Sequence, residues 1–123
     1  MTIVELYEEI GGNYEQAVKV MRMDKLIDKH IRRLKTNEVF DAVREAGETM
    51  DPVRLFESTH ALKGMCANLG LDSIAALASE ITEDFRPGAS RKLTDEEVKE
   101  KIARIDELHK KTIDGITRYE AES

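Results

Sequence analysis

The chain has 123 residues, the usual size of one compact domain. Hydrophobic residues make up 41% of it, too high a share for a disordered segment, so we expect it to fold. Its 25 Asp and Glu outnumber its 19 Lys and Arg, giving a formal net charge of −6, and it therefore lacks the positive field that nucleic-acid binding requires.

Residues that lose little rotamer freedom in a helix are abundant, and aromatic residues form only 5% of the chain, which predicts an all-α protein. The one cysteine cannot form an intrachain disulfide, and the N-terminus is acidic where a signal peptide would be basic and apolar. We therefore expect a cytoplasmic protein. No stretch approaches the ~20 apolar residues of a membrane span, and the ordinary start at Met1 favours a free-standing chain.

The first part of the chain predicts short helices. Apolar residues recur at the spacing of one helix face, and the expected helices cover 3–10, 14–21, 23–36 and 38–46. Gly11 and Gly12 stop the first helix, Asn13 can cap the second, and Gly47 is expected to end the fourth.

Longer helices are predicted over 52–69, 72–85 and 94–119. Asp51 and Pro52 form a start signal, because Asp accepts hydrogen bonds from free amides and Pro has no amide to leave unpaired. Gly70 can end this helix, Asp72 can cap the next one, and Thr94 opens a capping box with Glu97 three residues later.

The very short connection at Gly70 and Leu71 predicts that the helices on either side fold back as an antiparallel hairpin. Four substantial amphipathic helices with short connections bury their apolar stripes by packing side by side. We therefore predict an all-α antiparallel four-helix bundle with short additional N-terminal helices, formed by one domain over 1–123. Gly115 is a weak point in its last helix.

Three of the candidates for chemistry are best interpreted as structural. His30 interrupts an apolar stripe and His109 lies in the seam of the last helix, where an imidazole is usually a core or boundary residue. Cys66 lies on the core stripe of its helix, and a lone buried cysteine behaves as a small hydrophobe.

His60 differs, because it projects off the apolar stripe onto a face that it shares with Lys63 and Gly64. A mid-helix Gly costs roughly 1 kcal/mol relative to Ala, and any side chain at Gly64 would be expected to crowd the imidazole. Lys63 supplies a countercharge for a phosphoryl group. A neutral imidazole can attack a phosphoryl donor without a base, so this pattern predicts an exposed nucleophile.

The segment from Ser58 to Gly70 reads STHALKGMCANLG. It resembles the His-x-Leu-Lys-Gly-(x)3-Asn-Leu-Gly signature of histidine-containing phosphotransfer domains, the HPt family of two-component phosphorelays. The resemblance extends upstream to the turn at 11–14 and downstream to Phe85, whereas the last helix matches by pattern alone.

The resemblance implies a four-helix bundle with His60 as phosphoacceptor, Lys63 as support for the phosphoryl group and Gly64 as the residue that gives access. It implies partners that are receiver domains of response regulators or hybrid histidine kinases, with the aspartate and Mg²⁺ on the receiver. The chain itself would then need no cofactor and have no kinase activity. Transfer from one exposed histidine requires one chain, so we expect a monomer.

The sequence pattern leaves two other functions open. A helical docking module with the same fold would bind partners without phosphotransfer, although docking alone has no need for His60, Lys63 and Gly64 together. A di-metal carboxylate bundle would use Glu57 and His60 as a Glu-x-x-His pair, but such bundles need two copies and the chain has one. A histidine-kinase helix is not expected, because no Gly-rich phosphate-binding motif is present.

Overall fold

The computed structural model describes residues 1–122, and this part of the chain contains helices and no strand. The elements in chain order are α1 (Ile3–Ile10), α2 (Tyr14–Met21), α3 (Asp24–Arg32), a 3₁₀ turn η1 (Arg33–Lys35), α4 (Val39–Thr49), α5 (Pro52–Asn68), α6 (Asp72–Asp84) and α7 (Asp95–Ala121). The prediction of an all-α protein is confirmed.

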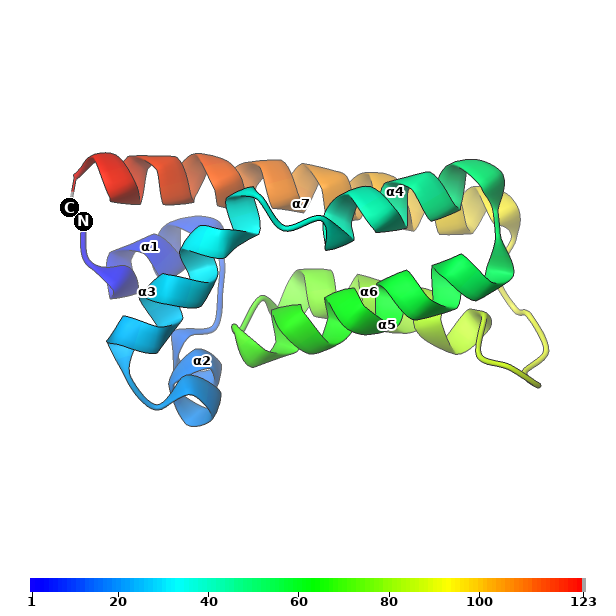
Figure 1. Ribbon diagram of the computed structural model, residues 1–123, viewed down its shortest axis with the longest axis horizontal. Coiled ribbons are helices and arrows are strands. Elements are labelled where there is room, and N and C mark those ends of the chain that lie inside the picture. Colours follow the sequence, from blue (N-terminus) through cyan, green and yellow to red (C-terminus); the bar gives the residue numbers. More distant parts are fainter. Residues whose placement is uncertain (123) are drawn as a thin grey trace.

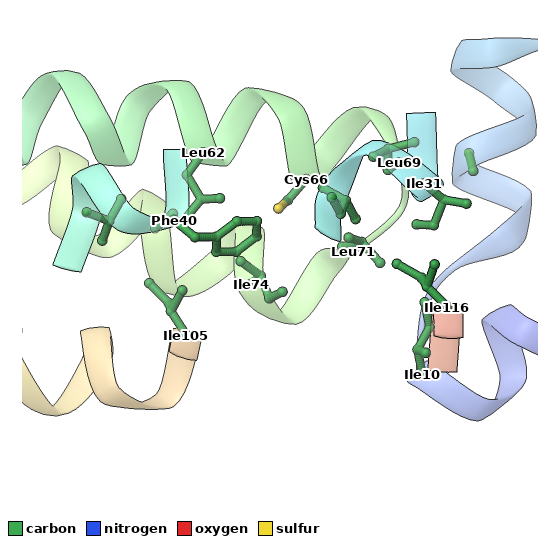
Figure 2. Close-up of a cluster of buried hydrophobic side chains, with 14 of the residues drawn as sticks. Ile10, Ile31, Phe40, Leu62, Cys66, Leu69, Leu71, Ile74, Ile105 and Ile116 are labelled. Atoms are coloured by element: carbon green, nitrogen blue, oxygen red, sulfur yellow. The ribbon is translucent and has the colours of Figure 1, made fainter. Parts of the chain in front are cut away.

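Helices α4, α5, α6 and α7 form an antiparallel bundle, and the shorter α1, α2 and α3 gather at the end where α5 turns into α6 (Figure 1). The core lies between the four long helices. Figure 2 shows side chains from all four of them turned toward one another, among them Phe40, Leu62, Cys66, Ile74 and Ile105. These residues are at most 4% exposed, so the apolar stripes read from the sequence do form the interior.

Side-chain caps fix most of the helix starts. Thr2 and Thr94 each form a complete capping box, Asn13 accepts from the amide of Gln16, and Asp51 accepts from two amides of the first turn of α5. The expected cap of α6 is wrong. Asp72 is the first residue inside that helix, and its carboxylate accepts a 3.1 Å hydrogen bond from Asn13.

Gly47 does not end α4, and the predicted end at residue 46 is wrong. The helix continues to Thr49 and ends at Met50, whose φ of 52° is left-handed. A Cβ on Gly47 would lie 2.5 Å from Cδ1 of Ile102 on α7. The missing side chain therefore lets α4 approach α7 closely, a packing role that outweighs the stop signal.

The N-terminal helices are packed into the bundle. A Cβ on Gly115 of α7 would lie 2.5 Å from Cγ2 of Ile10, so α1 sits directly on this glycine. The buried hydroxyl of Tyr7 donates a 2.7 Å hydrogen bond to the carbonyl of Leu69 at the end of α5. Gly115, predicted as a weak point, is thus a contact site between α1 and α7.

The loop between α6 and α7 is tied to Asp84. Its buried carboxylate accepts hydrogen bonds from the amides of Lys92 and Leu93, at 2.6 and 3.0 Å, and from the guanidinium of Arg91 at 3.0 Å. Burial alone would raise the pKa of Asp84, but these hydrogen bonds and the charge of Arg91 outweigh it and lower the pKa. One carboxylate thus fixes the path of the loop.

The start of the chain and the end of α7 lie side by side at one end of the bundle (Figure 1). The amino group of Met1 is 3.4 Å from a carboxylate oxygen of Glu122, and Arg118 pairs with Glu9 one helix turn further in. Helix α1 therefore runs antiparallel to the last part of α7. Within residues 1–122, no helix is both long and apolar enough to cross a membrane.

Candidate functional site

A buried pair of threonines sets how α5 and α6 face each other. The hydroxyls of Thr59 and Thr82 lie 2.8 Å apart, and each also lies within hydrogen-bond distance of the carbonyl four residues before it. Because the helices are antiparallel, the residues that follow, His60 and Glu83, project to the same side of the pair.

His60 is exposed near the middle of α5, as the sequence predicts. Its ring lies parallel to that of Phe56, one turn earlier, with 5.8 Å between the ring centroids and an interplanar angle of 6°. This stacking orients the imidazole along the helix surface while leaving it open to solvent. The geometry suits a nucleophile that another protein has to reach.

Lys63 lies one turn beyond His60 and is half-buried. Within residues 1–122, no carboxylate lies within ion-pair distance of its ammonium group. This cation therefore remains available to a negatively charged group at His60.

Gly64 is exposed, and a Cβ built on it would meet no atom within 4 Å. The expectation that any side chain there would crowd the imidazole is therefore wrong for a single methyl group. What Gly64 leaves open is the space above the helix surface, through which a larger group would approach His60.

Glu83 near the end of α6 and Arg86 just beyond that helix complete this side of the helix pair. Arg86 donates two hydrogen bonds to the carboxylate of Glu83, at 2.9 and 2.7 Å, and its Cζ lies 5.5 Å from the centre of the Phe56 ring. The hydrogen bonds from Arg86 are the main cause of a lowered pKa of Glu83, and the nearby side chains of Lys63 and His60 add to it. We call these five side chains, Phe56, His60, Lys63, Glu83 and Arg86, the α5/α6 face.

Sequence reasoning missed Phe56, Glu83 and Arg86. The signal for Phe56 is its place four residues before His60 on a helix. For the residues of α6 the signal is symmetry about the hairpin turn, because Thr59 and Thr82 are equally far from the bond between Gly70 and Leu71. Counting outward from that turn pairs Thr82 with Thr59, and the antiparallel helix geometry then turns Glu83 and His60 to the same side.

The structural interpretation of Cys66 and His109 is confirmed. His109 is buried, its ring stacks on Phe40 at 3.5 Å between centroids, and its Nε2 lies 3.2 Å from the carbonyl of Leu34. Burial lowers the pKa of His109, which favours the neutral imidazole. Burial also raises the pKa of the Cys66 thiol to about 12, so the thiolate is not formed.

The remaining candidates, His30 and Glu57, lie outside the buried core of the bundle. His30 is half-buried on α3, as expected of a boundary residue. Glu57 is exposed on α5, and among residues 1–122 no group of three or more His, Cys, Asp or Glu side chains could hold a metal ion. The second Glu-x-x-His pair that a di-metal bundle requires is not assembled by these residues.

Comparison with known proteins identifies the family. The family model of the Hpt domain matches residues 23–111, well over half of the chain, and the chain therefore belongs to the Hpt domain family. Proteins of this family carry phosphoryl groups on histidine in phosphorelays, interact with receiver domains and are not kinases. Searches of curated proteins and of solved structures gave no match.

Proposed function

We propose that this chain accepts a phosphoryl group on His60 from the aspartyl phosphate of a receiver domain, and passes it on to another receiver aspartate. The observation that carries the proposal is the exposed imidazole of His60, stacked on Phe56, with Lys63 one turn away and no carboxylate among residues 1–122 within ion-pair distance of its ammonium group. The family match over 23–111 includes all three residues.

The transfer is a displacement at phosphorus. A ring nitrogen of neutral His60 attacks, a P–N bond forms, and the P–O bond to the receiver aspartate breaks with its electron pair leaving on the carboxylate. The other ring nitrogen keeps its proton. Lys63 offsets the negative charge that the phosphoryl group brings to the helix surface, and Gly64 leaves room for the receiver's phosphorylated loop.

The partner supplies the rest of the chemistry in this proposal. The receiver domain, of a response regulator or a hybrid histidine kinase, brings the aspartate and the Mg²⁺ that balances the charge of the transferring group. The chain needs neither a cofactor nor kinase activity of its own, and a monomer is sufficient. A cytoplasmic location remains a prediction from the sequence.

The test is intact-mass analysis after incubation with a phosphorylated receiver, for the wild type, His60→Ala and the control His30→Ala. We expect one acid-labile phosphoryl group on the wild type and on His30→Ala, and none on His60→Ala. Because His60 is exposed, its replacement should change the free energy of unfolding by no more than about 0.5 kcal/mol.

Two results would contradict the proposal. A phosphoryl group retained by His60→Ala would move the acceptor to another residue. An absence of any adduct across several receivers, with folding intact, would leave a docking module that does not transfer phosphate.

A further inference from the structure

The α5/α6 face carries a carboxylate where the proposed phosphoryl group requires positive charge. Glu83 follows Thr82, the residue that touches Thr59, just as His60 follows Thr59 on α5. The antiparallel arrangement therefore turns the carboxylate and the imidazole to the same side. This is an unfavourable neighbour for a phosphohistidine, which brings about two negative charges.

Glu83 is also paired with the guanidinium of Arg86. Its two oxygens accept both hydrogen bonds from Arg86, at 2.9 and 2.7 Å, and this pairing holds the guanidinium 5.5 Å from the centre of the Phe56 ring. Phe56 in turn stacks on the imidazole of His60. A continuous set of contacts thus links the carboxylate of Glu83 to the ring that would be phosphorylated.

We propose that Glu83 acts as a resident competitor of the phosphoryl group: its carboxylate occupies Arg86 and repels the phosphorylated His60, which keeps the phosphohistidine a good donor. This inference rests on the proposed phosphorylation of His60. Glu83 touches neither the phosphorus nor the leaving group, so it is a positioning residue, whose effect is to disfavour the phosphorylated state relative to the free imidazole.

Glu80 provides a matched control on the same helix. It is an exposed carboxylate one turn earlier, but it pairs with Lys101 of α7 and not with Arg86. Glu80→Gln removes the same charge from the same helix without altering the α5/α6 face.

The experiment measures the equilibrium constant for phosphoryl exchange between this chain and one receiver domain, approached from both directions, for the wild type, Glu83→Gln and Glu80→Gln. The constant compares unbound species, so a change in docking affinity alone leaves it unchanged. For Glu83→Gln we expect a shift toward phosphorylated His60 of about 3- to 10-fold, from the loss of one nearby negative charge. At 1 M salt, where the Debye length is about 3 Å, the shift should shrink.

The proposal is overturned if the constant for Glu83→Gln stays within about twofold of wild type at low salt, or if Glu80→Gln shifts it equally. These results differ from a failure of the proposed function, in which the wild type itself takes no phosphoryl group on His60. In that case the competitor role falls as well. Circular dichroism of both variants checks that the helices are intact.

Discussion

Gly64 is exposed and a Cβ there meets no neighbour within 4 Å, so we expect this position to keep open the space above His60. We predict that Gly64→Leu slows phosphoryl transfer by about tenfold or more, because the longer side chain reaches over the imidazole. The change should stabilise the helix by up to about 1 kcal/mol, since Leu has the higher helix propensity.

Gly64→Ala is the graded control for this prediction. Its methyl group gains the same kind of helix stability and reaches no neighbour, so transfer should be slowed less than in Gly64→Leu. Single-turnover transfer rates with one phosphorylated receiver check both variants. Equal rates for Gly64→Leu and wild type would refute the access role.

At the scale of single residues, the sequence indicates His60, Lys63 and Gly64 because they lie within one turn of a single helix, where spacing alone places them on one face. It does not indicate Glu83 or Arg86 by spacing within one helix. Their approach to His60 depends on how α5 and α6 are paired, which the contact between Thr59 and Thr82 decides. A pairing between helices is a property of two apolar stripes together and is not encoded in either stripe.

The hairpin of α5 and α6 depends on Gly70. Its φ of 71° is left-handed, and a Cβ there would overlap the backbone carbonyl oxygen of Asn13. The amide of Asn13 also donates a 2.7 Å hydrogen bond to the carbonyl of Gly70. We predict that Gly70→Ala lowers the free energy of unfolding by about 3 kcal/mol or more, from backbone strain together with this overlap.

Gly88 is the control for that substitution. Its φ of 85° is also left-handed, but a Cβ there would meet nothing within 4 Å. Gly88→Ala should therefore cost only the backbone strain, about 1 kcal/mol. Urea unfolding of both variants makes the comparison, and equal losses would show that the contact with Asn13 contributes nothing.

The hydrogen bonds that tie the loop between α6 and α7 to Asp84 predict that the stability of the protein depends on pH. The pKa of Asp84 is lowered in the folded protein, so its contribution to stability is present above the unfolded pKa of about 3.9 and is lost as the pH falls through the folded value. Asp84→Asn should lower the free energy of unfolding by about 2 kcal/mol at pH 7. The difference from wild type should shrink below about pH 4.

Urea titrations between pH 3 and pH 7 measure this difference. Asp95→Asn is the control, because Asp95 shares Arg91 as partner but is exposed, and its loss should cost less than about 1 kcal/mol. A penalty for Asp84→Asn that stays constant across this pH range would contradict the role of its charge.

At the scale of helices, starts were easier to predict than ends. The starts of α5 and α7 follow from Asp51 and Thr94, whose side chains act on amides a few residues away. The end of α4 was missed because Gly47 carries two signals. Its weak helix propensity argues for a stop, while the close approach of Ile102 favours a glycine inside the helix, and that approach is a tertiary contact.

For the whole molecule, the amphipathic stripes and short connections were sufficient to predict the all-helical bundle, because each stripe has to be buried against another. They do not show where α1 and α2 attach. These helices precede Met23, where the family match begins, and their attachment depends on single contacts such as that of Tyr7 with Leu69. Such contacts join residues far apart in the chain and leave no local pattern.

The neighbouring ends of the chain determine how the molecule responds to a pulling force. Because α1 runs antiparallel to the end of α7, a load applied between the termini separates Met1 from Glu122 first and then reaches Ile10 on Gly115, one contact after another. We expect α1 to peel away at low force, as an early step before the four long helices rupture, in a single-molecule pulling experiment. A single high-force rupture would contradict this order. Under tension the molecule would lose its terminal helix while α5, which bears His60, stays folded.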